Sequence, residues 1–194
     1  MKTASYTIKG TTPMLMHSER LANPFDPLTR QLKELTKQRT KPEAVLLEIA
    51  RIEWLGGLYT DEDGVIAVPG YNLLACIING GKLHKLGTAV KRAAIVAEDW
   101  APVKYDGPKN ADKLFENKGF VDIRSVKVGT AKVARCRPIF KAWQCTFTVA
   151  FDDSTLQASE LDMCVKSAGM MVGLGDYRPR FGRFEVVNTP KALA

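Results

Sequence analysis

The sequence has little of what common enzyme motifs require. Its 194 residues include two histidines and four cysteines. It contains no Walker loop (G-x-x-x-x-G-K-[ST]), no H-E-x-x-H and no G-x-S-x-G. These patterns mark a phosphate-binding loop, a zinc site and a nucleophilic serine, respectively. The sequence therefore does not support these three kinds of catalysis, and we expect no cofactor and no metal ion.

Long hydrophobic runs are also absent. No apolar run approaches the roughly 20 residues of a membrane-spanning helix, and residues 1–18 lack the continuous apolar core of a secretory signal. The cysteines form no C-x-x-C pair and have no histidine at zinc-ligand spacing. They lie among apolar neighbours, as buried free thiols do: Cys76, Cys136, Cys145 and Cys164. We expect a cytoplasmic protein with no membrane partner.

What is present is ordinary for a globular protein, with 45% apolar and 25% charged residues. The length allows one sizeable domain, and we expect a single domain over residues 1–194. The formal net charge is +7. A surplus of that size is compatible with a polyanionic partner.

Periodicity and turn residues predict the order of secondary structure. The expected elements are a strand at 4–9, a loop at 17–30, helices at 43–59, 71–78 and 86–97, a short strand at 64–70, an extended segment at 101–105, strands from 120 to 151, a helix at 156–171 and a last strand at 181–187. Gly80 and Gly81 should separate the second and third helices. Pro138 should separate a strand at 132–137 from one at 139–151, and Ser154 or Thr155 should cap the last helix.

This order indicates an α+β protein. It is compatible with a ferredoxin-like (RRM-like) β-α-β-β-α-β core. In that arrangement residues 17–60 form a helical insertion, and residues 120–138 form an inserted basic β-hairpin.

The predicted hairpin concentrates positive charge. Residues 122–141 hold six basic side chains against the single acid Asp122: Arg124, Lys127, Lys132, Arg135, Arg137 and Lys141. Guanidinium and ammonium groups at strand spacing can follow a row of phosphates. The alternative is an exposed sheet edge that charge protects from aggregation. The concentration of charge favours binding.

A second basic segment lies between the last predicted helix and strand. Residues 173–183 contain three glycines, Gly173, Gly175 and Gly182, which allow close backbone approach or positive φ. They also contain three cations and two aromatic rings: Arg178, Arg180, Arg183, Tyr177 and Phe181. Backbone amides, arginines and aromatic faces together suit a single-stranded nucleic acid.

Histidines and acids offer weaker candidates. His17 follows the first strand and could act as a general base for RNA cleavage through the 2′-hydroxyl. A loop histidine that packs or contacts a phosphate is the simpler interpretation. His84 is expected at the surface beside lysines, and the acidic run 61–63 is expected in a solvated turn rather than a cation site.

Three segments resemble one known family. Residues 173–184 have the form G-L-G-x-x-R-x-x-F-G-R-F before the last strand. Residues 68–74 (V-P-G-Y-N-L-L) are similar to a strand-to-helix step, I-P-G-S-S-L-[KR]-G, and residues 8–18 to a first strand and its loop. These features resemble the RAMP superfamily, the RNA-binding proteins of CRISPR systems. Tyr71 and Asn72 depart from the small pair of that step, and no basic residue directly follows Leu74.

The resemblance implies a ferredoxin-like fold and a backbone-subunit role, in which one protomer's basic hairpin folds over RNA held on the next. The short chain points to a stand-alone or phage-borne relative. We expect a non-enzymatic, largely sequence-independent single-stranded RNA-binding protein that forms a head-to-tail homo-oligomer along its ligand. The interface would consist of the hairpin cations, except Lys141, together with the glycine-rich segment and His17.

Other functions remain open at this point. One is a metal-independent RNA endonuclease of the guide-processing type, with His17 as base and the loop arginines holding the phosphate. Another is a protein that binds single-stranded DNA, or a phage protein that mimics subunits of a host complex. A basic assembly protein without nucleic acid is the last alternative.

Overall fold

The structure is a computed structural model that describes residues 1–188, apart from the side chains of Val128 and Ala131. The chain divides into two compact units. Unit 1 comprises Met1–Met14, Thr60–Asp106 and Phe140–Ala194, and unit 2 comprises Leu15–Tyr59 and Gly107–Ile139. The predicted insertions at 17–60 and 120–138 fall almost wholly in unit 2. That they extend a single domain stays a prediction.

Unit 1 is built on an antiparallel sheet whose centre is the pairing of β1 (Lys2–Gly10) with β8 (Gln144–Phe151). β9 (Phe184–Val186) pairs with the other side of β1. The remaining strands lie beyond β8: β4 (Ala94–Val96), β5 (Trp100–Lys104) and β3 (Ala67–Pro69). The strand order is β3-β5-β8-β1-β9, with β4 also paired to β8. Helices and antiparallel strands in one chain confirm the predicted α+β class.

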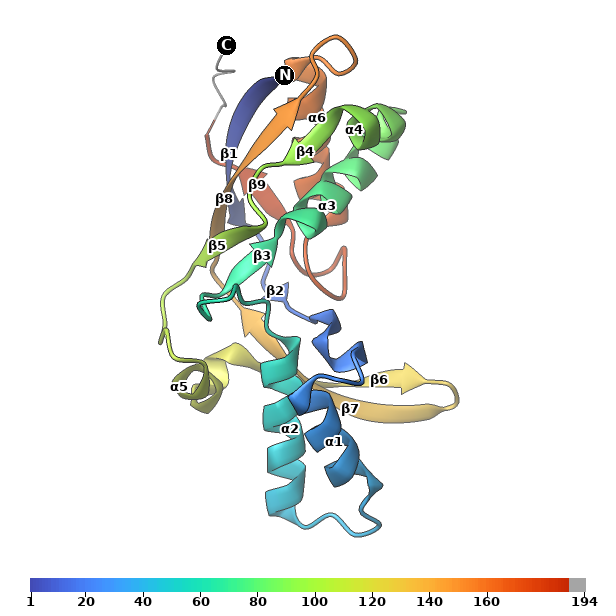
Figure 1. Cartoon of the computed structure of the whole chain (residues 1–194), viewed down its shortest axis with the longest axis vertical. Helices are drawn as coiled ribbons and strands as arrows, with labels where there is room; N and C mark the ends of the chain where they lie inside the picture. The colour runs from blue at the N-terminus through green and yellow to red at the C-terminus, as the bar shows by residue number, and fades with distance from the viewer. Residues whose placement is uncertain (189–194) are drawn as a thin grey trace. The chain divides into compact units, whose positions relative to one another are not determined.

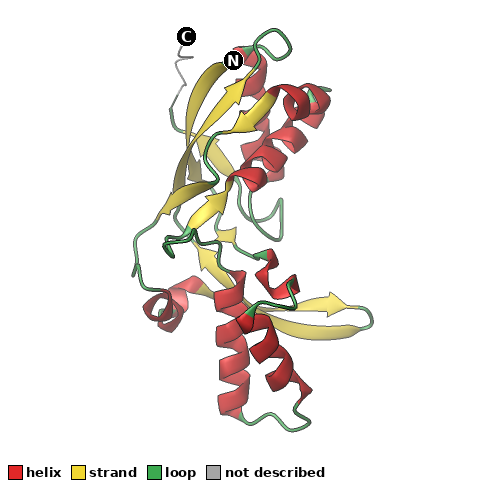
Figure 2. Cartoon of the chain, viewed as in Figure 1, coloured by secondary structure: helices red, strands yellow, loops and turns green. Residues whose placement is uncertain are grey.

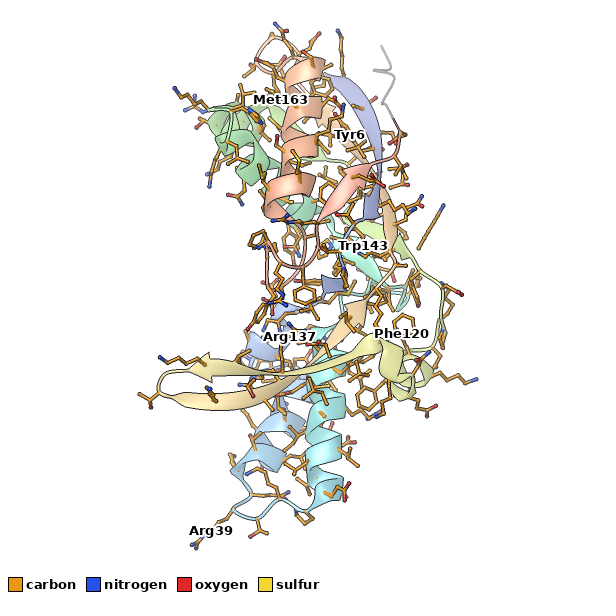
Figure 3. All side chains as sticks on the ribbon, turned by 180° about the vertical axis from the view of Figure 1, so that it is seen from behind. Tyr6, Arg39, Phe120, Arg137, Trp143 and Met163 are labelled. Atoms are coloured by element: carbon orange, nitrogen blue, oxygen red, sulfur yellow. The ribbon has the colours of Figure 1, made fainter. Side chains whose placement is uncertain are left out.

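Side-chain alternation gives this sheet one apolar face. Tyr6 pairs with Phe147, and Ile8 pairs with Cys145, and all four side chains are fully buried. On this face lie α3 (Gly70–Lys82), α4 (Gly87–Ala93) and α6 (Ala158–Ser167), as Figure 1 shows. Tyr6 faces α6 (Figure 3), and its burial raises the pKa of its hydroxyl above the usual value. This apolar layer is the core of unit 1.

The opposite face of β1 and β8 is polar. Thr7 and Thr146 lie side by side there, with their hydroxyl oxygens 3.1 Å apart, and Ser5 and Lys9 are exposed. The aromatic residues of both strands point to the helical side. In the described part of these two strands, the open face therefore offers no aromatic ring on which a base could stack.

Unit 2 combines a helical pair with a β-hairpin. α1 (Pro27–Lys37) lies against α2 (Glu43–Gly57), and β6 (Val121–Val128) pairs with β7 (Ala131–Phe140), as Figure 2 shows. The shorter elements are β2 (Met14–Leu15), η1 (Glu19–Ala22), α5 (Ala111–Glu116) and η2 (Lys118–Phe120). Trp54 on α2 is fully buried, and its indole N–H donates to the Phe120 carbonyl at 2.8 Å. This bond ties α2 to the start of the hairpin.

Two predicted boundaries were wrong because proline and glycine were taken as helix breakers. α1 begins inside the expected loop 17–30. Pro27 occupies the first helical turn, where its missing N–H costs nothing, and the Asp26 carboxylate accepts from the Leu28 N–H at 2.8 Å. α3 continues through Gly80 and Gly81. A Cβ on Gly80 would lie 2.4 Å from the Cys164 carbonyl oxygen, so glycine lets α3 approach α6 closely.

Tertiary pairing overrode two further predictions. The helix expected at 86–97 ends at Ala93, because residues 94–96 pair with β8 as β4. β7 runs through Pro138 to Phe140, so strand 139–151 is not continuous: β8 starts at Gln144. Pro138 has no N–H to donate, but its carbonyl accepts from the Met16 N–H at 3.0 Å, so the strand keeps this bond to the segment after β2.

The last helix and strand are shorter than predicted. Gln157, not Ser154 or Thr155, caps α6, and Glu160 completes a capping box. The hydroxyls of Ser154 and Thr155 bind Asp152 instead. Residues 168–172 form a π-helical turn, η3 (Ala168–Val172), and residues 181–183 belong to the loop before β9.

All four cysteines are buried free thiols, as predicted. Burial raises the pKa values of Cys76, Cys136 and Cys145 to about 12 and that of Cys164 to about 11. No helix within residues 1–188 has both the length and the apolar character of a membrane span.

Candidate nucleic-acid interface

The glycine-rich segment forms a loop closed at its base, in unit 1, between η3 and β9. The Leu174 N–H donates to the Gly182 carbonyl at 2.9 Å, and the Gly182 N–H donates to the Pro13 carbonyl at 2.8 Å. Gly182 has φ +74°, and a Cβ there would lie 1.7 Å from the Leu174 carbonyl oxygen. Glycine is therefore required where the two ends of the loop meet.

Trp143 stabilises the turn at residues 10–13, to which the base of the loop is hydrogen-bonded. The Trp143 indole N–H donates to the Thr12 carbonyl at 2.9 Å, and its ring packs edge-to-face on Phe184 (Figure 3 labels Trp143). The Thr12 hydroxyl in turn accepts from the Arg183 N–H at 2.9 Å. The C-terminal end of the loop is thus held by the turn at residues 10–13, and its N-terminal end is held by the bond between Leu174 and Gly182. A loop so anchored presents its tip in a defined place.

The three loop arginines have different surroundings. Arg183 is half-buried, and its Nε donates to the Pro179 carbonyl at 2.8 Å, inside the loop. Arg178 and Arg180 are exposed. No ion pair is described for either of them among residues 1–188. Arg178 and Arg180 are therefore available to an anion, whereas Arg183 supports the loop.

The two aromatic rings of the loop lie next to these arginines. Tyr177 is 42% exposed and contacts Phe181 edge-to-face, with ring centroids 6.2 Å apart. Tyr177 has φ +60°, in the left-handed region that side chains other than glycine rarely adopt. Tyr177 and Arg178 line a shallow pocket of about 550 Å³, together with Asn79 and Met171. The pocket combines a cation, an aromatic face, an amide and one carboxylate, that of Asp176.

The hairpin arginines are largely engaged within unit 2. Arg124 forms two hydrogen bonds with Asp122, and Arg135 pairs with Glu53 on α2. Glu53 is 7% exposed and also accepts from the Cys136 N–H at 3.0 Å. Arg137 is 7% exposed (Figure 3). Arg135 thus joins β7 to α2, Arg124 is paired within β6 and Arg137 is buried, and the exposed cations of β6 and β7 are Lys127 and Lys132.

The tip lysines face each other across the ladder, because Lys127 and Lys132 are register partners. Like charges directly opposite each other destabilise a strand pair. A bound polyanion relieves that repulsion. Of the predicted hairpin residues, these two therefore keep the properties of a phosphate contact.

His17 belongs to unit 2 and the glycine-rich loop to unit 1, so the structure groups them separately. The His17 side chain is exposed, and its carbonyl accepts from the Tyr59 hydroxyl at 2.9 Å. In the described part of the chain, no group of three or more histidine, cysteine or acidic side chains is arranged to hold a metal ion.

Sequence reasoning missed Glu53, which decides what Arg135 does. It lies 82 residues before Arg135, and it sits in a helix whose apolar pattern conceals its single buried acid. No local motif signals such a pair. The family models and the curated proteins compared with this chain contain no match to it.

Removing Glu53 should loosen the hairpin. We expect Glu53→Ala to lower the free energy of unfolding by about 2 kcal/mol, because the variant leaves Arg135 and the Cys136 N–H without their acceptor. Glu43→Ala, which removes an exposed carboxylate from the first turn of the same helix, should cost less than about 1 kcal/mol. Chemical denaturation of both variants measures the difference. Equal losses would show that the buried pair does not hold the hairpin.

Proposed function

We propose that this chain binds single-stranded RNA through the glycine-rich loop of unit 1, without cleaving it. The observation that carries the proposal is that two exposed arginines, Arg178 and Arg180, and the exposed ring of Tyr177 lie on the same anchored loop. Guanidinium groups bind phosphates, and aromatic faces stack on unpaired bases. Contacts of this kind are largely independent of base sequence.

The open sheet face is the obvious competing surface, and its composition favours the loop. RNA-binding sheets of the RRM type stack bases on aromatic side chains of their central strands. Here Tyr6 and Phe147 point into the core, while Thr7 and Thr146 occupy the open side. Lys9 on β1 and Lys104 on β5 are exposed cations of this open side, where both are register partners of Gln144.

We assign unit 1 to the ferredoxin-like fold and, with it, to a RAMP-like protein. The supporting observation is the strand order β9-β1-β8-β4. Leaving aside the segments of unit 2 and the strands β3 and β5, the chain passes from β1 through α3 and α4 to β4, then to β8, and through α6 to β9. Each helical crossover leaves one strand between the two strands it joins, as a split β-α-β unit does. The loop with the family's glycine-rich pattern leads into β9, the last strand.

Self-assembly along RNA is the second part of the proposal. By the RAMP resemblance, the β6–β7 hairpin of one protomer covers RNA held by the next. Lys127 and Lys132 at its tip are the side chains that would touch that strand. Repetition of one such heterologous contact produces a filament or ring.

The assembly is tested by gel filtration of protein purified without nuclease or high salt. We expect a large species that carries nucleic acid and collapses on treatment with ribonuclease. Collapse only with deoxyribonuclease would assign the ligand as DNA. A nucleic-acid-free monomer would contradict the assembly.

The loop is tested by Arg178→Ala/Arg180→Ala in fluorescence anisotropy with labelled single-stranded RNA. We expect Kd to rise on the order of 100-fold, since two charge-assisted contacts are lost and each is worth about 1.5 kcal/mol. The slope of log K against log salt should fall by about 1.4, because each phosphate contact contributes about 0.7.

Lys9→Ala/Lys104→Ala is the matched control, because it removes the same charge from the open sheet face of unit 1. It should leave Kd within about twofold of wild type, allowing for long-range electrostatics. The reverse result, with the control weakened and the loop variant unchanged, would place the RNA on the sheet and overturn the site. Intact RNA after incubation with the wild type is expected for a binding protein; cleavage that disappears in His17→Ala would identify a nuclease.

A further inference from the structure

Three lysines surround a hollow in unit 1, where α3 turns into α4. Lys82 ends α3, Lys85 lies in the connecting turn and Lys91 lies on α4, and together they line a space of about 440 Å³. All three are exposed. None of the residues lining the hollow is acidic, and among the described ion pairs none involves these lysines. The hollow is therefore a concentrated site of positive charge.

Glycines bring these lysines together. A Cβ on Gly87 would lie 2.6 Å from Lys82 Cγ, and a Cβ on Gly81 would lie 3.3 Å from the Gly87 nitrogen. The absence of side chains at Gly81 and Gly87 therefore lets the two helices meet closely. As a result, three lysine side chains line one hollow, and their ammonium groups repel one another unless an anion is bound.

Lys85 has a backbone conformation that does not suit lysine. Its φ is +61°, in the left-handed region where glycine or asparagine is preferred. In residues 1–188, the non-glycine residues with positive φ are Lys85 and Tyr177. At Lys85 this conformation belongs to a helix C-cap, in which the Leu86 N–H donates to the Gly81 carbonyl at 2.8 Å. Tyr177 lines the pocket of the glycine-rich loop, and Lys85 lines the lysine hollow.

The two depressions are neighbours on the same unit. Asn79 lines both of them. Its Oδ1 accepts from Lys82 Nζ at 2.9 Å, so the amide side chain directly joins the lysine hollow to the pocket beside Arg178. The exposed loop arginines and the three lysines thus lie at the two ends of adjoining depressions, which meet at Asn79 and hold one acid, Asp176, beside Arg178.

We infer that Lys82, Lys85 and Lys91 form a second phosphate-binding site, which holds the sugar-phosphate backbone of the same strand that the glycine-rich loop binds. This inference rests on the proposed function. The residues lining the hollow include no aromatic ring, so the site contacts the backbone rather than stacking bases. The Thr88 hydroxyl, which also lines the hollow, adds a neutral donor for a phosphate oxygen.

The test compares two RNA lengths. Oligomers of about 5 and about 16 nucleotides bracket the sizes of small single-strand sites. For Lys82→Ala/Lys85→Ala/Lys91→Ala we expect at least about a tenfold higher Kd for the longer RNA and a salt slope lower by about 2, from three lost phosphate contacts. The shorter RNA, which occupies the loop alone, should keep its affinity within about threefold.

Two control variants test whether the effect depends on the charge of the three lysines and on their position, and an unfolding measurement tests whether the fold is intact. Arginine at the same three positions should restore binding of the longer RNA, because the charge is kept. Alanine at Lys33, Lys37 and Arg39 removes the same charge from exposed positions on α1 and the loop after it (Figure 3 labels Arg39) and should change little. Thermal unfolding of each variant verifies that the fold is intact.

Each remaining outcome has one meaning. The lysine variant could bind the longer RNA with wild-type affinity while Arg178→Ala/Arg180→Ala still weakens binding. This result would overturn the second site and leave the proposed function standing. Equal loss on both RNA lengths also overturns it, since the lysines would then act at the loop itself. A wild type that binds neither RNA overturns both proposals.

Discussion

The pairing of β1 with β8 is the constraint on which the rest of unit 1 depends. Its register places Tyr6, Ile8, Cys145 and Phe147 on one face. A shift by one residue would move all of them to the other face. That apolar face determines where α3 and α6 pack, and the close contact of these helices requires Gly80. The ladder also ends beside the turn at residues 10–13, which anchors the glycine-rich loop through Pro13 and Thr12.

Positive charge is distributed in two ways that have different consequences. In unit 2, Arg124 and Arg135 are paired with Asp122 and the buried Glu53, so their charge stabilises the hairpin. In unit 1, Arg178 and Arg180 are exposed on the glycine-rich loop, and the α3–α4 lysines are exposed around one hollow. Net charge alone does not distinguish these cases. The position of the acids does, because a neutralised guanidinium has little left to offer a phosphate.

The parts of the fold that sequence reasoning predicted well are those with a local cause. The alternation of Cys145, Phe147, Val149 and Phe151 predicted β8 and its buried face, and the helical apolar repeat predicted α2. The errors at Gly80, at 94–96 and at Pro138 have a common origin. Each was decided by a partner distant in sequence: α6, β8 and the segment directly after β2, where Met16 lies, respectively.

The candidate site shows the same division. The three glycines, the arginines and Tyr177 were visible as a cluster because they are neighbours in sequence. The different role of Arg183, which supports the loop, was not visible in the sequence. It depends on the hydrogen bond that Arg183 Nε donates to the Pro179 carbonyl within the folded loop. Asn79 of α3 lines the same pocket as Tyr177 and Arg178, although about a hundred residues separate them in the sequence. No periodicity in the sequence signals this proximity.

Photo-crosslinking of single-stranded RNA, followed by identification of the modified peptides, tests the central claim most directly. A zero-length crosslink reports which side chain touches a base, independently of affinity. We predict crosslinks at Tyr177 or Phe181 of the glycine-rich loop. Crosslinks confined to the open face of β1 and β8, or to unit 2, would contradict the assignment of the loop as the RNA-binding site.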